Sequence, residues 1–412
     1  MKYVPVFFMM VFFSLPGNTF CQLENNRQTK DEFSPRKLRY HPDGSDFVID
    51  NGNRRYNRAL YGTHTAFRVE AGDLPEFALF MPGIGGDFKL GIISENKSKW
   101  CNDFSYIQSR YRPGSMIYHL RDKMLGNAQI DLQLLAMNDA EGILLRVIVA
   151  GTVPELKLVW AFGGASGIHP SRNGDIGADP ESVFYLTPEH CRNNIFTIDH
   201  ESFGLEFPDK NKIISLEGLT PINSKLQIAD ANYQESPASL LQSSFNKATP
   251  VLAGQKVLKT NDTLYFGIRR KDSLSHFSIS ELPETFASAE HYREQLVKRI
   301  KIETPDPFLN TIGGAITIAA DALWESPEFM HGAVAWRIPL NGWRGQYAAD
   351  DLGWHDRAKT YFTTYNESQL TYPDSTIMDP DPTKNLARQV EKQAFGQLMA
   401  FGILQEIPRI AK

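Results

Sequence analysis

Residues 128–150, AQIDLQLLAMNDAEGILLRVIVA, decide the fold. The first part alternates apolar with polar side chains and places Ile130, Leu132 and Leu134 on one side, as in a strand with one buried face. Residues 138–142 include turn formers, and residues 143–150 are a continuous apolar run. The stretch therefore predicts two neighbouring strands joined by a short turn.

The same alternation recurs on both sides of this stretch, over residues 115–120 and 156–162. Further along, residues 255–259 and 263–268 flank Asn261-Asp262, which is a hairpin signal. Strands at short, regular spacing without helical patterns between them are typical of an antiparallel sandwich. We predict a large β-sandwich domain over residues 46–282.

The apolar period changes after this domain. Residues 284–300 carry apolar side chains at three- and four-residue spacing, which predicts a linker helix within 283–303. Asp306 and Pro307 have the residue types of a helix N-cap and first helical position. The apolar stripe expected on this next helix comprises Phe308, Ile312, Ile316, Ala319 and Leu323.

Two more helices are expected in the helical region 304–412, at about residues 347–365 and 383–404. Each has an apolar stripe that needs a partner. We therefore expect association through exposed helical faces if these stripes stay uncovered. The predicted fold class is α+β multidomain.

The composition excludes some partners. The net charge of the 412 residues is -5, and basic residues are scattered. This disfavours binding to nucleic acid or to an anionic membrane surface. Residues 4–15 are apolar and follow Lys2, but they are too few to span a membrane. We predict a signal peptide over residues 1–21, a mobile lead-in over 22–45 and a periplasmic or extracellular location. No second segment is apolar for long enough to cross a bilayer.

Cys101 and Cys191 remain after the predicted cleavage. One disulfide and two buried thiols are both compatible with the sequence. No metal-ligand spacing, phosphate loop or dinucleotide motif occurs, so neither a metal nor a cofactor is expected.

The densest chemistry lies in residues 331–357, HGAVAWRIPLNGWRGQYAADDLGWHDR, which hold three of the six tryptophans. Aromatic rings stack on the apolar faces of sugars, and charged groups hydrogen-bond hydroxyls. The stretch therefore predicts a glycan-binding cleft, to which Trp354 and His355 would contribute. The alternative is a packed loop and helix whose tryptophans and charges serve only the fold. Asp351 and His355 are four apart, so a helix would place them on one face.

Glycosidic hydrolysis usually needs two carboxyl groups that flank the bond. Asp350 and Asp351 are adjacent and would point ~100° apart on a helix, so they cannot serve together. We expect one of them to act as a catalytic acid or a sugar ligand. The candidates for the second carboxyl are Glu325, Glu328, Asp379 and Asp381.

Residues 304–324, TPDPFLNTIGGAITIAADALW, together with residues 331–358, resemble the six-hairpin glycosidases. Within that superfamily the chain looks most similar to large secreted bacterial proteins of uncharacterised function. The resemblance implies an N-terminal supersandwich, a helical linker and an (α/α)6 toroid. It also implies sugar contacts by Trp336, Arg337, Trp343, Arg344 and Asp351.

A toroid needs about twelve helices, which exceeds ~200 residues, and residues 304–412 hold only its beginning. The resemblance thus implies a glycoside-hydrolase-like protein that acts on or binds complex polysaccharide or oligosaccharide and is truncated within its catalytic domain. The alternatives are a non-catalytic carbohydrate-binding protein and an inactive fragment of a larger hydrolase.

Overall fold

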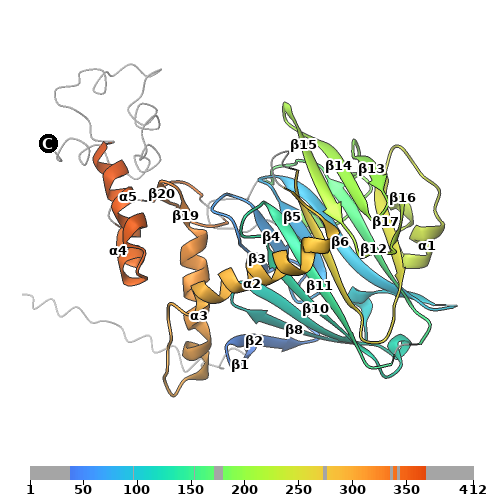
Figure 1. Cartoon of the computed structure of the whole chain (residues 1–412), viewed down its shortest axis with the longest axis horizontal. Coiled ribbons are helices and arrows are strands. Elements are labelled where there is room, and N and C mark those ends of the chain that lie inside the picture. Colours follow the sequence, from blue (N-terminus) through green and yellow to red (C-terminus); the bar gives the residue numbers. More distant parts are fainter. Residues whose placement is uncertain are drawn as a thin grey trace, which may run out of the picture. The chain divides into compact units, whose positions relative to one another are not determined.

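The computed structural model describes residues 38–95, 97–152, 154–170, 180–271, 276–334, 337–340 and 344–367. The helices and strands named below all lie in one compact unit, Tyr40–Lys412. Antiparallel strands dominate its first part and helices its last part, and the strands form two sheets that pack face to face (Figure 1). The fold is therefore an antiparallel β-sandwich followed by helices.

Among the described residues, one sheet has ten strands and another has eight, and every pairing in them is antiparallel. The ten-stranded sheet runs in the order β1 His41–Asp43, β2 Asp46–Asp50, β8 Tyr106–Arg112, β9 Ser115–Arg121, β10 Gln129–Ala136, β11 Gly142–Ala150, β18 Thr263–Arg270, β15 Lys212–Leu219, β14 Ser202–Asp209 and β13 Ile195–Asp199.

The eight-stranded sheet runs in the order β16 Lys225–Asp230, β17 Pro250–Val257, β12 Lys157–Ala165, β6 Ile84–Ile93, β5 Glu76–Phe80, β4 Arg68–Ala71 and β3 Arg58–Leu60, and β7 Ser98–Trp100 pairs with β6. Short 3-10 turns lie between the strands: η1 Cys101–Asp103, η2 Lys123–Leu125, η3 Glu181–Phe184, η4 Ala231–Tyr233 and η5 Ile279–Glu281.

The alternating stretches form the core between the two sheets. The side chains predicted to share a buried face all belong to one hydrophobic cluster: Met116, Tyr118, Leu120, Ile130, Leu132, Leu134, Leu156, Leu158, Trp160 and Phe162. The turn in residues 138–142 also joins neighbouring strands, since β10 pairs with β11 from Ala136↔Ile143 to Gln129↔Ala150. Both predictions are confirmed.

The predicted hairpin around Asn261-Asp262 is wrong. β17 pairs with β12 and β16 in the eight-stranded sheet, whereas β18 pairs with β11 and β15 in the other sheet. The turn itself exists, because Asp262 Oδ2 accepts a hydrogen bond from the Lys259 amide at 2.8 Å. The local signal identified a turn, but strand partners are chosen by packing across the whole domain.

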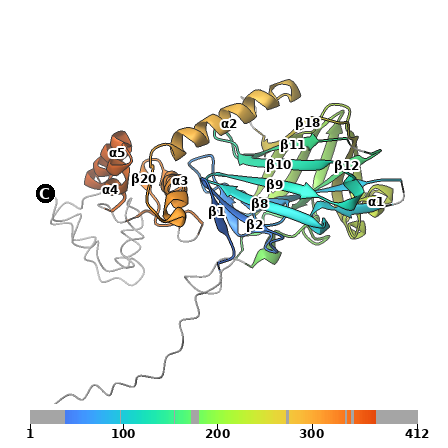
Figure 2. The same ribbon diagram turned by 90° about the horizontal axis from the view of Figure 1, so that it is seen from below.

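Helix α2, Leu282–Val297, covers the outer face of the ten-stranded sheet (Figure 2). Leu282, Phe286 and Ala289 pack there against Leu135 and Leu144, which point away from the main core. Helix α1, Pro237–Gln242, lies on the outer side of the eight-stranded sheet, beside β16 and β17 (Figure 1). Helices thus cover part of each outer face.

Helix α3, Pro307–Ala322, begins where expected, since Asp306 Oδ1 accepts a hydrogen bond from the Phe308 amide at 2.8 Å. Two residues of the expected apolar stripe, Ile312 and Ile316, are exposed, so the stripe is not fully covered within the described residues. The buried face instead contains Gly314, where an added Cβ would lie 2.7 Å from a Val297 methyl carbon. Close contact with α2 requires a face of small residues, and this requirement overrides the apolar pattern.

A short hairpin of β19 Trp324–Glu325 and β20 Glu328–Phe329 follows α3. The next helices are α4, Arg344–Asp351, and α5, His355–Glu367. They replace the single helix expected at about 347–365. Gly353 has φ +72°, and the amides of Gly353 and Trp354 donate to the carbonyls of Asp350 and Ala349 at 2.9 and 2.7 Å. These bonds form a Schellman motif, which ends a helix.

Cys101 and Cys191 are both buried and free, so the two-thiol alternative holds in this structure. Burial raises the pKa of Cys101, and it raises that of Cys191 to about 12. Both thiols are therefore protonated and unreactive near neutral pH.

The predicted signal peptide, residues 1–21, and the helix expected at 383–404 lie outside the described residues. In the part of the chain that the structure does describe, no helix combines the length and hydropathy needed to cross a bilayer.

Candidate functional site

The structure places some of the predicted site residues. Trp336 and Trp343 lie outside the described residues, and Arg344 is placed only as the first residue of α4. The side chains of Arg337, Asp350, Asp351, Trp354 and His355 are described, and they do not all lie at one place. The site must therefore be assembled from the residues that share a cavity or a contact.

Two of the predicted residues, Asp350 and His355, face one cavity of about 480 Å³ at the junction of α4 and α5. Phe362 also lines it, and its side chain is 46% exposed. The remaining lining residues are Ala358, Lys359 and Thr363. One open cavity thus combines a carboxylate, an imidazole and an accessible aromatic ring.

Asp350, and not Asp351, is the partner of His355. Nδ1 of His355 donates a hydrogen bond to Oδ1 of Asp350 at 2.9 Å, and both side chains are exposed. The spacing of four residues had suggested Asp351, but the turn at Gly353 interrupts the helix between them. Asp351 is exposed and does not line the cavity.

Trp354 is a packing residue in this structure. Its side chain is only 7% exposed and belongs to a hydrophobic cluster with Leu296, Ile318 and Tyr361. The guanidinium carbons of Arg299 and Arg357 lie 5.2 and 4.5 Å from its ring centroid. The burial of its ring and these cation–π contacts favour a structural role for Trp354.

Arg337 is engaged with Glu325, which was a candidate for the second carboxyl. Nε of Arg337 donates to Oε2 of Glu325 at 2.9 Å, and Nη1 donates to the Ala322 carbonyl at 3.2 Å. Glu325 is therefore a charged partner that holds the loop after the hairpin to the end of α3.

Glu328 has a different environment. It sits opposite Glu325 in the β19–β20 hairpin and is buried, and this burial raises its pKa to about 7. A carboxyl that keeps its proton near neutral pH is suited to general-acid work. Of the other second-carboxyl candidates, Asp379 and Asp381 lie outside the described residues.

A buried polar cluster joins the sandwich to the helices. Oδ1 of Asp321, on α3, accepts a hydrogen bond from Nη1 of Arg357 at 2.8 Å and lies 3.2 Å from Nε2 of His64. Oδ2 of Asp321 accepts from the Tyr292 hydroxyl at 3.1 Å. Burial opposes ionisation of Asp321, but the interactions with His64 and Arg357 outweigh it and lower the pKa of this carboxyl.

This cluster escaped the sequence interpretation because its members are distant in the chain: His64 and Asp321 are separated by 257 positions. The one sequence signal for this cluster is that an aspartate, Asp321, stands in an otherwise apolar helical pattern. As for metals, no group of three or more His, Cys, Asp or Glu side chains that could hold an ion occurs within the described residues.

A family model, "Domain of unknown function (DUF4450)", matches residues 81–290, which is half of the chain. The chain belongs to this family. The DUF4450 segment covers most of the sandwich and the first half of α2. The cavity at α4 and α5 lies C-terminal to it in the sequence.

Two solved structures are similar to this chain. One is a bacterial glucoamylase complexed with acarbose, with 8% identity and a TM-score of 0.46, covering 77% of this chain and 51% of that chain. The other is a family GH92 inverting mannosidase from Bacteroides thetaiotaomicron, with 10% identity and a TM-score of 0.35, covering 69% of this chain and 36% of that chain. The chain thus spans about half the length of the first and about a third of the second. No curated protein matches the sequence significantly.

Proposed function

We propose that this chain is a glycoside-hydrolase-like protein that acts on or binds complex polysaccharide or oligosaccharide at its helical end. The observation that carries the proposal is the cavity that Asp350, His355 and the exposed ring of Phe362 line together. An aromatic face offers a platform for the apolar side of a sugar ring, and the carboxylate and imidazole can hydrogen-bond its hydroxyls.

In the catalytic form of the proposal, Asp350 is the base or nucleophile, and His355 orients it through the 2.9 Å hydrogen bond. Glu328 is the proton donor, since its pKa of about 7 leaves about half of it protonated in neutral solution. The β19–β20 hairpin that carries Glu328 packs against α5, where the ring centroids of Phe329 and Tyr361 are 5.9 Å apart. This packing fixes Glu328 relative to the helix that lines the cavity.

A non-catalytic carbohydrate-binding protein is the second candidate. One observation favours it: Glu328 is buried and does not line the cavity of Asp350 and His355. Binding needs a platform and polar ligands but no second carboxyl. We also keep as proposals that residues 304–412 begin an α/α toroid and that residues 1–21 direct export from the cytoplasm.

The test measures sugar release and binding by the chain without residues 1–21 on a panel of oligosaccharides and polysaccharides. The matched variants are Asp350→Asn and Asp351→Asn, since both residues are exposed but only Asp350 lines the cavity. We expect release to fall at least ~100-fold for D350N and to change little for D351N. Binding without release in the wild type would select the binding protein. A chain with neither property would contradict both candidates and leave the inactive fragment.

A further inference from the structure

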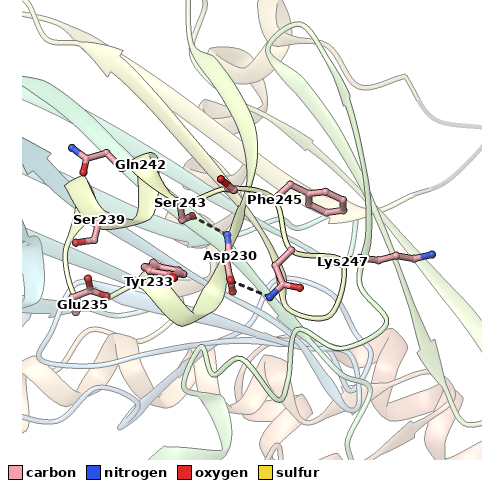
Figure 3. A pocket seen from close by; sticks show the side chains of 10 residues that line it. Asp230, Tyr233, Glu235, Ser239, Gln242, Ser243, Phe245 and Lys247 are labelled. Atoms are coloured by element: carbon pink, nitrogen blue, oxygen red, sulfur yellow. Dashed lines mark hydrogen bonds between the residues drawn. The ribbon is translucent and has the colours of Figure 1, made fainter.

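A second cavity lies on the outer side of the eight-stranded sheet, between η4, α1 and the loop that follows α1 (Figure 3). Its volume is about 770 Å³, within the ~300–1,000 Å³ typical of small-molecule sites. Tyr233 and Phe245 line it, and their side chains are 51% and 59% exposed. Apart from these two, the exposed aromatic side chains among the described residues are Tyr347 and Phe362. Two of the exposed aromatic rings of the described residues therefore line the same cavity.

One buried carboxylate fixes the positions of both aromatic segments. Oδ1 of Asp230 accepts hydrogen bonds from the Asn232 amide at 3.0 Å and from the Thr249 hydroxyl at 2.6 Å. Its Oδ2 accepts from Nδ2 of Asn246 at 3.0 Å. Asn232 belongs to the turn that carries Tyr233, and Asn246 follows Phe245. Because both segments are attached to Asp230, a ligand would meet rings that are already positioned.

The third wall is attached to the same residue. The Ser243 hydroxyl accepts a hydrogen bond from the Asp230 amide at 3.0 Å (Figure 3). It donates a hydrogen bond to the Leu240 carbonyl at 2.7 Å. This pair of bonds joins the end of α1 to the end of β16. Helix α1 contributes Ser239 and Gln242 to the lining. The cavity thus has walls held by hydrogen bonds within the fold.

The lining indicates the class of ligand. The lining carries two negative charges, from Asp230 and Glu235, against one positive charge, from Lys247. Phosphorylated or acidic ligands are therefore disfavoured. Aromatic rings beside the Gln242 amide, the serine hydroxyls and the Glu235 carboxylate suit a ligand with apolar faces and many neutral hydroxyls. An uncharged carbohydrate has these properties.

We propose that Tyr233 and Phe245 form a binding site for neutral carbohydrate on the sandwich, separate from the cavity of Asp350 and His355. Its volume suits an oligosaccharide segment. The ligand class follows from the chemistry of this cavity, so the inference does not depend on catalysis at the helical end. Such a site would hold a polymer against the protein whether or not the helical end cleaves it.

The test isolates this site in a chain that carries Phe362→Ala, which removes the aromatic platform of the other cavity. Binding is measured by calorimetry with maltohexaose, cellohexaose, xylohexaose and mannohexaose, and by retardation in native gels that contain the corresponding polysaccharides. We expect at least one of these glycans to bind. Adding Tyr233→Ala and Phe245→Ala should weaken that binding at least tenfold. Adding Tyr233→Phe and Phe245→Tyr should retain it, because the rings remain.

Two results would overturn the inference. One is an absence of binding by every glycan of the panel to the F362A chain. The other is unchanged affinity after both alanine substitutions, in a variant whose thermal midpoint matches that of its parent. Loss of sugar release in D350N, with glycan retention intact, would concern the helical cavity alone, so failures of the two proposals are distinguishable.

Discussion

Asp321 on α3 and Arg357 on α5 form a buried ion pair, with 2.8 Å between Oδ1 and Nη1. The same carboxylate contacts His64 of the sandwich and Tyr292 of α2. The guanidinium group of Arg357 also lies over the rings of Trp324 and Trp354, at 5.6 and 4.5 Å. One carboxylate therefore attaches three helices and the sandwich to each other.

Asp321→Asn should destabilise the chain by about 3 kcal/mol at pH 7, because it leaves the largely buried Arg357 without a counter-charge. Urea unfolding at several pH values measures this. The folded-state pKa of Asp321 is lowered, so the stability it contributes is present above its unfolded pKa and is lost as pH falls through the folded pKa. The deficit of D321N should therefore shrink in acid.

The matched control is Asp356→Asn, an exposed carboxyl beside Arg357 whose replacement should stay within about 0.5 kcal/mol. Equal losses of unfolding free energy in the two variants would show that the contacts of Asp321 stabilise the fold no more than an exposed carboxyl does.

Glu328→Gln should stabilise the chain in alkaline solution. Burial raises the pKa of Glu328 in the folded chain to about 7. Its contribution to stability is therefore least favourable at a pH where the carboxyl is ionised in both the folded and the unfolded chain. Stability should fall as pH rises from about 4.5 to about 7 and then stay constant. The amide cannot ionise, so E328Q should exceed the wild type by roughly 1–3 kcal/mol at pH 8 and match it at pH 4. Parallel stability curves over this range would refute the assigned environment of Glu328.

Gly353→Ala should separate α4 from α5. Gly353 has φ +72°, which an alanine adopts at a cost of about 1 kcal/mol. The backbone hydrogen bonds donated by the amides of Gly353 and Trp354 would weaken. The contact between His355 and Asp350 would weaken with them. Gly353→Asn is the control, since asparagine tolerates this conformation better. The unfolding midpoint should be highest for the wild type, lower for G353N and lowest for G353A. A higher midpoint for G353A than for G353N would contradict the left-handed conformation at position 353.

Gly314→Val should disturb the contact between α3 and α2. An added Cβ at this position would lie 2.7 Å from a Val297 methyl carbon, so α3 must shift. We expect a loss of about 1–3 kcal/mol, measured by chemical denaturation. Ala319→Val, on the exposed side of the same helix, is the control and should change stability by less than about 1 kcal/mol. Similar losses at both positions would mean that helix propensity, rather than packing, sets the effect.

Leu309, Ile312 and Ile316 form an exposed apolar face on α3. If this face drives association of the chain, replacing Ile312 and Ile316 by serine should reduce self-association in sedimentation velocity without lowering the unfolding midpoint. An unchanged sedimentation profile would exclude this face as the contact.

Local patterns predicted the sandwich well because each strand buries one face. The alternation in residues 156–162 put Leu158, Trp160 and Phe162 in the core without any knowledge of their partners. The same local information could not choose between partners, so the turn at Asn261-Asp262 was mistaken for a hairpin when it joins two sheets. It also could not foresee that Gly314 would bring α3 close to α2 and expose Ile316.

The candidate site was predicted in part. Residue types drew attention to Asp350 and His355, and both line one cavity. The sequence pattern paired His355 with Asp351 instead of Asp350. A glycine inside a polar helical pattern is only a weak signal that the helix ends there. Phe362 was missed, since a single aromatic residue in a helix usually serves packing. The cluster around Asp321 needed contacts that no local pattern carries.

The most direct test of the central claim compares two exposed aromatic side chains of the helical end in one assay of glycan affinity and sugar release. Phe362 lines the cavity of Asp350 and His355, whereas Tyr347, which is 63% exposed, does not. We predict that Phe362→Ala weakens binding or lowers kcat/KM at least tenfold in a chain whose Tyr233 and Phe245 are replaced by alanine. Tyr347→Ala in the same background should leave both quantities within about twofold. Equal behaviour of the two variants would contradict glycan recognition at this cavity.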